Sequence, residues 1–255
     1  MPITAPTPIL MSGSVGGPGA ANRAADVSAV QGKLMAIRET SSWEGVPLRG
    51  QSYAGLGPRG EISRMPTGVC DDITVGWIKE FQSLFMKTPD GVISPGGTTH
   101  KFMNGWALSP VNAGVNFNTP QLKTAWMILS PLLPAQSKCT SAYRSAADQQ
   151  RIIDNMWTVT YAAELRTRLG ARYDTIGAMT GDARYAAMVT ELRAIGQQVA
   201  RPGTSPHQKG KAIDIGGPAD AEQVRVATMV AGANSTLYNG TILKERNGCV
   251  HVEIR

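Results

Sequence analysis

The sequence is poor in two residue types that often build metal and redox sites, with only three histidines and three cysteines in 255 residues. The cysteines lie far apart and form no CxxC pair, which argues against a thiolate metal site and favours small buried side chains. Histidine-based chemistry must therefore come from His100, His207 and His251.

Long apolar runs and runs of basic residues are also missing. No stretch approaches the roughly 20 apolar residues that cross a bilayer, so we expect no membrane insertion. The net charge of +6 favours an anionic partner, such as an acidic cell-wall polymer. The 25 Lys and Arg residues are scattered rather than clustered, so nucleic acid is not an expected partner.

A secretory signal is not evident near Met1. The first residues contain no basic cluster, and the apolar stretch at residues 9–11 is too short for a signal peptide. We therefore expect synthesis in the cytoplasm. A route other than general secretion would carry the protein to any site of action in the periplasm or outside the cell.

The composition along the chain predicts an α+β fold in four parts. Residues 1–24 are rich in Pro, Gly, Ser and Ala and predict a flexible or loosely docked leader. A small helical domain is expected over residues 25–108, with Asp26 as the N-cap of its first helix. Residues 109–120 predict a linker, and residues 121–255 a second domain with a small antiparallel sheet flanked by helices.

The second domain has a recognisable order of elements. Strands are expected near residues 137–143 and 213–215, and a β-hairpin around Asn247-Gly248. Residues 151–204 predict a long helical insertion between the first two strands. We expect this insertion to shape a cleft.

A motif in the helical domain joins a helix to a tight turn. The helix ends in Phe81-Gln82, the turn Pro89-Asp90-Gly91 follows, and Thr98 and Thr99 come next. Gly91 suits the positive φ of such a turn, and a threonine can cap the following helix. The pattern resembles the peptidoglycan-binding domain of wall hydrolases over about residues 25–104.

The Gly- and Pro-rich insertion at residues 39–70 departs from that family. The motif residues also suit a purely structural role in a small helical domain. His100, beside the turn, has no partner that the sequence reveals, and we expect it on the surface.

The strongest signal for chemistry lies near the C-terminus. Ser205, His207, Gly210 and Asp214 follow one another closely, and a later strand carries His251. Zinc accepts imidazole nitrogen and carboxylate oxygen as ligands. A loop that turns at Gly210 can bring His207 and Asp214 to one ion, with His251 as third ligand. Ser205 would orient the His207 side chain without binding the ion itself.

These residues follow the pattern Ser-x-His-x-x-Gly-x-Ala-x-Asp and a late His, with Tyr143-Arg144-Ser145 and Gln149 upstream. Over about residues 120–255 the chain resembles the zinc D-alanyl-D-alanine carboxypeptidase family. That family includes VanY-type carboxypeptidases and the L-alanyl-D-glutamate endopeptidases of phage lysins. The resemblance implies that Arg144 contacts the scissile peptide. It also implies that Tyr143, Ser145, Gln149 and Ser205 lie on the substrate side.

One position departs from this family. Its members usually have an acidic general base three residues before the last histidine, where this chain has Gly248. Glu253 shares a strand face with His251 by alternation and is the preferred replacement, although it also suits an exposed partner of Arg255. Glu245, across the hairpin turn, is the alternative, and its facing depends on the strand register.

The resemblance implies a zinc-dependent peptidoglycan peptidase, either a carboxypeptidase or an endopeptidase, that cleaves cell-wall stem peptides. With the delivery route inferred above, we expect an antibacterial secreted effector or a phage-type lysin. Its partners would be peptidoglycan and either a cognate immunity protein or a secretion or tail component. The alternative is a non-catalytic zinc-containing protein that binds the wall or belongs to a spike, as the glycine at position 248 would allow.

Overall fold

The computed structural model describes residues 7–40, 66–218 and 220–255, and its architecture is α+β, as the sequence predicts. The helices are α1 (Ala24–Thr40), α2 (Asp72–Gln82), α3 (Thr98–Asn104), α4 (Pro120–Leu129), α5 (Ala146–Asn155), α6 (Ala162–Leu169), α7 (Arg172–Ala178), α8 (Gly181–Ala194) and α9 (Asp220–Ala233). The strands are β1 (Val15–Gly16), β2 (Val92–Ile93), β3 (Lys138–Ser141), β4 (Ala212–Gly216), β5 (Tyr238–Lys244) and β6 (Val250–Ile254).

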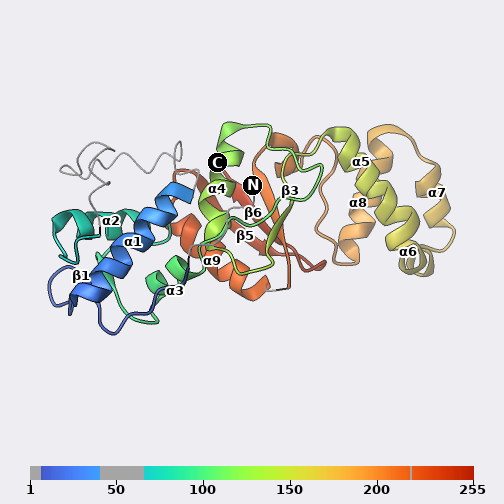
Figure 1. Cartoon of the computed structure of the whole chain (residues 1–255). Helices are drawn as coiled ribbons and strands as arrows, with labels where there is room; N and C mark the ends of the chain where they lie inside the picture. Colours follow the sequence, from blue (N-terminus) through green and yellow to red (C-terminus); the bar gives the residue numbers. More distant parts are fainter. Residues whose placement is uncertain (1–6, 41–65, 219) are drawn as a thin grey trace.

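Three parts of the molecule lie in a row (Figure 1). Helices α1–α3 are at one end, the larger sheet with α4 and α9 is in the middle, and α5–α8 are at the other end. Most of the predicted insertion at residues 39–70 falls outside the described residues. Among the helices that the structure describes, none has the length and apolar character needed to cross a membrane.

Residues 7–23, the described part of the predicted leader, are packed onto the helical part of the structure. Val15 is fully buried and pairs with Ile93 in the short antiparallel sheet of β1 and β2. The backbone of Ile9 exchanges two hydrogen bonds with the side chain of Asn104, of 2.8 and 3.0 Å. Composition alone could not decide between a free and a docked leader because the anchoring residues are distant in the sequence.

Asp26 anchors this segment and is not the N-cap that we predicted, since α1 already begins at Ala24. Its carboxylate accepts hydrogen bonds from the backbone amides of Ser12 and Gly13 and from the Ser12 hydroxyl, each of 2.9 Å. The hydrogen bond from the Ser12 amide is the main reason that the pKa of Asp26 lies below its usual value.

His100 is buried, with 9% of its surface exposed, which corrects the prediction of a surface histidine. Its Nδ1 accepts a hydrogen bond of 2.9 Å from the Gly96 amide, so its Nε2 carries the proton and donates to the Ile9 carbonyl at 3.0 Å. The imidazole therefore ties the N-terminal segment to α3.

Gln82 is the fully buried centre of the turn motif. Its Oε1 accepts a hydrogen bond of 2.8 Å from the Gly91 amide. Its Nε2 donates to the Asp90 carboxylate (2.7 Å), the Val92 carbonyl (3.0 Å) and the Thr99 hydroxyl (3.2 Å). The motif therefore has a structural role in joining α2 to α3.

The larger sheet is antiparallel, with strand order β3-β4-β6-β5. Side chains alternate between the two faces of a strand. One face packs against α4 and α9, and its central strands contribute Ile213, Ile215, Val250, Val252 and Ile254 to the core. The opposite face carries Asp214 and His251, which are direct cross-strand partners.

The predicted linker at residues 109–120 runs beside β3 in the structure. The Cys139 amide donates to the Pro110 carbonyl, and the Asn112 amide donates to the Cys139 carbonyl, both at 2.9 Å. An edge strand has unpaired backbone groups, and this segment satisfies them. The connection is therefore docked along the sheet.

Buried apolar side chains form two clusters. The main core joins the N-terminal helices to the sheet and includes both Phe81 and Val252. The second core lies among α5–α8, where Trp157 stacks on Tyr173 with ring centroids 4.9 Å apart. The division of the chain into two domains stays a prediction, and the main core spans both sides of residues 109–120.

The three cysteines are free thiols. Cys139 is buried, as the sequence predicts, but Cys70 and Cys249 are only half-buried. Burial raises the pKa of the Cys139 thiol to about 12. The Cys139 side chain therefore behaves as a small apolar residue of the main core.

Candidate metal centre

A short turn ahead of β4 sets the position of His207. The Ser205 hydroxyl accepts a hydrogen bond of 3.3 Å from the His207 amide and begins a 3₁₀ turn over Pro206–Lys209. Gly210 ends the turn with φ of +64°, where a Cβ would lie 2.8 Å from the Asn118 side-chain oxygen. A glycine is therefore required at this position, and Ser205 holds the backbone of the turn rather than the imidazole.

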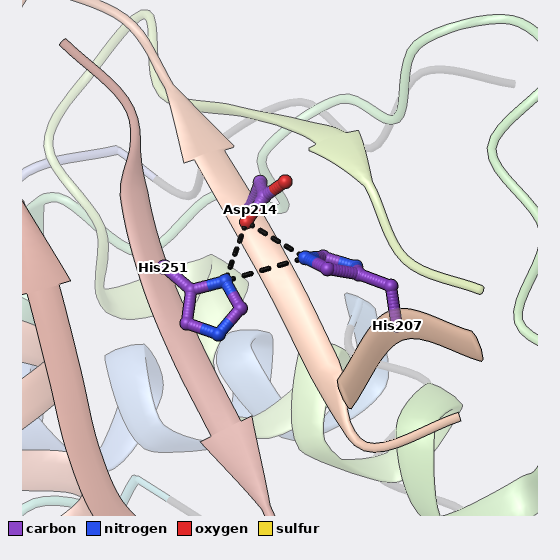
Figure 2. A group of neighbouring side chains, drawn as sticks. All are labelled: His207, Asp214 and His251. Atoms are coloured by element: carbon purple, nitrogen blue, oxygen red, sulfur yellow. Dashed lines mark hydrogen bonds and ion pairs between the residues drawn. The ribbon is translucent and has the colours of Figure 1, made fainter. Parts of the chain in front are cut away.

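His207, Asp214 and His251 converge from this turn and from two neighbouring strands (Figure 2). The His207 Nε2 atom lies 3.1 Å from Asp214 Oδ1 and 3.2 Å from His251 Nδ1. The His251 Nδ1 atom lies 2.9 Å from Asp214 Oδ1. The three residues are only 3%, 4% and 7% exposed. The structure thus brings together the three ligands that the sequence predicts.

The outer contacts of the two imidazoles indicate which nitrogens carry protons. The His207 Nδ1 atom lies 2.5 Å from the Ala142 carbonyl oxygen, so it donates there and leaves Nε2 with a lone pair. The His251 Nε2 atom faces the Glu253 carboxylate at 3.6 Å, which favours a proton on that nitrogen and a lone pair on Nδ1. Two lone pairs and the carboxylate of Asp214 therefore face one another, an arrangement that a cation stabilises.

The separations of these atoms suit a tetrahedral divalent cation. Zinc bonds of about 2.0–2.1 Å at the tetrahedral angle would set ligand atoms about 3.3 Å apart. The three observed separations run from 2.9 to 3.2 Å. Two imidazoles and one carboxylate form a donor set that is typical of catalytic zinc sites with a fourth position for water or substrate.

The electrostatics of the cluster keep Asp214 ionised. Burial alone would raise the pKa of Asp214. When no cation is bound and the facing ring nitrogens of His207 and His251 carry protons, hydrogen bonds from these imidazoles and the nearby Arg144 guanidinium hold the pKa well below its usual range. Arg144 forms an ion pair with Asp214 Oδ2, and its Nε donates to the Ser141 hydroxyl at 2.7 Å.

The cluster opens onto a cavity of about 530 Å³ between the sheet and the helical insertion. Ile152 of α5, Met156 just after it and Arg193 of α8 form part of its wall. The insertion therefore shapes this cavity, as we expected. The residues with polar groups that also line it include Arg144, Gln149, Gln197, Ser205, Glu245 and Glu253.

Two of the four residues predicted on the substrate side line the cavity, and the other two do not. Gln149 and Ser205 line the cavity, whereas Tyr143 and Ser145 are not among its lining residues. Ser145 is the N-cap of α5 and forms a capping box with Asp148. Tyr143 packs against the main core. The positions of Tyr143 and Ser145 are thus those of structural residues.

Two buried glutamine amides lie in the cavity wall. Gln149 Nε2 donates to the Ala200 carbonyl at 3.0 Å, and Gln149 Oε1 has no hydrogen-bond partner among the described residues. Gln197 Nε2 likewise has no partner in the described part of the chain. Sequence reasoning missed Gln197 because it follows α8, far from the motif, and no spacing marks it.

The hairpin register shows how the two candidate acids face. Leu243 pairs with His251, and the Glu245 amide donates to the Cys249 carbonyl at 2.8 Å. Residues 243, 245, 249 and 251 therefore share one face of the hairpin, and Glu245 lines the cavity. Glu253 lies on the same face, as alternation predicts.

A larger cavity of about 760 Å³ lies between α3, the segment that follows α4, and α9. Its charged lining residues are Lys101, Glu222 and Arg225. Glu222 and Arg225 pair with each other through hydrogen bonds of 2.6 and 2.7 Å. The lining has no histidine or cysteine, so the chemistry belongs to the smaller cavity.

A comparison with protein families supports this location. The model of VanY, D-alanyl-D-alanine carboxypeptidase, matches residues 134–239. The match includes Arg144, His207 and Asp214 and ends before His251. Searches of curated proteins and of solved structures gave no significant match. Residues 134–239 therefore belong to a VanY-like domain, a peptidase domain of the carboxypeptidase type that acts on peptidoglycan.

Proposed function

We propose that the protein is a zinc-dependent peptidase that cleaves the stem peptides of peptidoglycan. The observation that carries this proposal is the convergence of His207 and Asp214, from the VanY-like part, with His251 of the following hairpin, with ligand atoms within 4.8 Å of one another. Nε2 of His207, Oδ1 of Asp214 and Nδ1 of His251 would hold the zinc. Bound zinc polarises a carbonyl group and lowers the pKa of a water molecule towards about 7.

The protein's own side chains bind the substrate and move its protons. Arg144 borders the cavity beside Asp214, where its guanidinium can contact the substrate carbonyl or terminal carboxylate and stabilise developing negative charge. A carboxylate, Glu253 or Glu245, would accept a proton from the attacking water and pass it to the leaving amine.

We also propose that residues 25–108 tether the enzyme to the wall. Support comes from the resemblance of the Phe81-Gln82 and Asp90-Gly91 motif to peptidoglycan-binding domains. A tether of this kind raises the effective concentration of the substrate at the metal centre.

The second candidate function is a non-catalytic zinc-containing protein that binds the wall or belongs to a spike. Gly248 favours it, because the acid expected at that position is missing. The peptidase is the better supported function because two other glutamates face the cavity.

The test is digestion of purified peptidoglycan with and without a metal chelator, followed by mass mapping of the fragments. We expect new termini in the stem peptides that vanish with chelator and return with added zinc. The identity of the termini names the bond that is cut. Zinc binding without any new terminus would instead establish the non-catalytic protein.

A matched pair of variants ties this activity to the centre. His207→Ala is expected to abolish both zinc binding and cleavage, because it removes one of three ligands. Lys209→Ala changes an exposed residue of the same turn and is expected to preserve both. Retained cleavage by a folded His207→Ala variant would rule out the proposed centre.

A further inference from the structure

The two glutamates that border the cavity have different surroundings, and these surroundings separate their roles. We infer that Glu245 is the general base of the peptidase and that Glu253 is a positioning residue that holds His251. The inference rests on the proposed function. Strand alternation alone favours Glu253 as the base, because it places Glu253 on the same face as His251. Alternation does not show which nitrogen of the His251 ring Glu253 faces, and that nitrogen decides its role.

Glu253 lies behind His251 as seen from the metal centre. Its Oε1 lies 3.6 Å from His251 Nε2, and its Oε2 accepts a hydrogen bond of 2.6 Å from Asn239. Figure 2 shows that the other ring nitrogen, Nδ1, is the one directed at Asp214 and His207. One carboxylate oxygen of Glu253 therefore faces the outer ring nitrogen, and the other is bound by Asn239.

This contact has a counterpart at the other histidine. The Ala142 carbonyl lies 2.5 Å from the outer nitrogen of His207, and the Glu253 carboxylate lies 3.6 Å from the outer nitrogen of His251. Outer contacts of this kind fix the orientation and tautomer of a metal-binding imidazole and increase its basicity. The surroundings of Glu253 thus match those of a ligand support.

Glu245 is placed on the cavity side of the same centre. It sits opposite Cys249 at the end of the hairpin, one pair along the face from His251. Among the described residues, Asn247 is the one hydrogen-bond donor to its carboxylate, through Oε2 at 3.1 Å. Burial and then the charge of Asp214 raise the pKa of Glu245, which makes it a better proton acceptor.

The turn explains why the acid is on this arm of the hairpin. Gly248 has φ of +83°, and its amide donates to the Glu245 carbonyl at 3.0 Å. A glutamate at position 248 would have to adopt a backbone conformation that residues with a Cβ rarely populate. The chain therefore has glycine in the turn, and the nearest acid on the cavity face lies three residues earlier.

In the reaction, Glu245 accepts a proton from water as the water oxygen forms a bond to the scissile carbonyl carbon. The carbon–nitrogen bond then breaks, and the same proton passes from Glu245 to the departing amine nitrogen. The products are one carboxylic acid and one amine, between which the second proton of the water passes to leave a carboxylate and an ammonium group, and Glu245 returns to its ionised form.

The experiment compares Glu245→Gln with Glu253→Gln in the full-length zinc protein. For each variant, kcat is measured on the peptide that peptidoglycan mapping identifies, and zinc affinity is measured by competition with a chromogenic chelator. We expect Glu245→Gln to lower kcat by about 10²–10⁴-fold with unchanged zinc affinity. We expect Glu253→Gln to weaken zinc binding by about 10–100-fold and to recover most of kcat at saturating zinc.

Two further variants separate these roles from simple loss of structure. Formate should partly restore the kcat of Glu245→Ala, because it can replace a missing carboxylate base, and should not restore His207→Ala. Asn239→Ala, which removes the partner of Glu253, should weaken zinc binding and leave kcat at saturating zinc unchanged. Thermal melting of every variant checks that it is folded.

The reverse pattern would overturn the assignment: loss of kcat in Glu253→Gln at full zinc occupancy, with Glu245→Gln active. Full activity in both variants would overturn it too. If the wild-type protein cleaves no peptide, the proposed function and the base role of Glu245 both fail. In that case zinc affinity alone still decides whether Glu253 supports His251.

Discussion

At the scale of single residues, buried glutamine amides organise the N-terminal part. The side chain of Gln82 forms hydrogen bonds with backbone groups of the Asp-Gly turn, and the side chain of Gln31 does so with backbone groups of the segment before α2. Gln31 accepts hydrogen bonds from the amides of Thr67 (2.9 Å) and Gly68 (3.1 Å). Its Nε2 donates to the Thr74 hydroxyl at 2.9 Å. Each amide satisfies backbone groups that would otherwise be buried without partners.

Gln82→Met should therefore be strongly destabilising. The thioether has a similar length but leaves the Gly91 amide and other buried groups unpaired, so we expect a loss of about 2–4 kcal/mol in the free energy of unfolding. Urea denaturation measures this loss. Gln121→Met, on the exposed side of α4, is the control and should change stability by less than about 0.5 kcal/mol. Similar losses in the two variants would contradict this account of Gln82.

At the scale of elements, one buried carboxylate docks a whole segment. Asp26 accepts three hydrogen bonds of 2.9 Å from Ser12 and Gly13. The segment also contributes Val15 to the main core. Its position thus depends on α1, on β2 and on α3 rather than on its own composition.

Asp26→Ala should release residues 7–23 while leaving α1 folded. We expect faster hydrogen exchange and faster proteolysis within this segment, with unchanged exchange in the larger sheet. Asp72→Ala, at an exposed position in the first turn of α2, is the matched control. Unchanged protection of residues 7–23 in Asp26→Ala would show that apolar burial alone docks them.

Acid should have the same effect on this segment. The pKa of Asp26 is lower in the folded protein than in the unfolded chain, where it is about 3.9. The stabilisation by the ionised carboxylate is therefore present above that pH and is lost as the pH falls through the folded pKa. The protection of residues 7–23 against hydrogen exchange, relative to an unfolded chain at the same pH, should fall below about pH 4 in the wild type. In Asp26→Ala, acid should lower this protection no further.

At the scale of the whole molecule, the two hydrophobic cores do not follow the predicted division of the chain at residues 109–120. The main core joins the N-terminal helices to the sheet, and the second core belongs to α5–α8 and the segments that join and follow them. The cavity with the candidate metal centre lies between the sheet and this helical insertion. Movement of the insertion against the sheet would therefore change the shape of the site.

The two cores should respond separately to cavity-forming substitutions. Leu165→Ala in the second core and Val252→Ala in the main core both truncate side chains that are 0% exposed. We expect Leu165→Ala to cost about 2–5 kcal/mol locally, with faster hydrogen exchange in α5–α8 only. Val252→Ala should loosen the sheet and the N-terminal helices together. Faster exchange across the whole chain in both variants would show that the cores unfold as one.

Several features were predictable because they depend on local sequence. The strands at residues 138–141 and 212–216 and the hairpin ending in β6 follow from short apolar patterns and turn residues. His207 and Asp214 are joined by one glycine turn, so their approach needs little information from the rest of the chain. The burial of His100 was predicted wrongly, and the docking of residues 7–23 was left open, because their partners are far away in the sequence.

The sequence by itself determined the chemistry of this protein: the ligand types, the glycine turn between His207 and Asp214, and the shared face of His251 and Glu253. Only the tertiary structure decided how these parts meet. Pairing of β4 with β6 sets Asp214 opposite His251, and the register of β5 brings Glu245 into the cavity. The physical reason is that strand register and ring orientation depend on long-range packing, which local patterns do not encode.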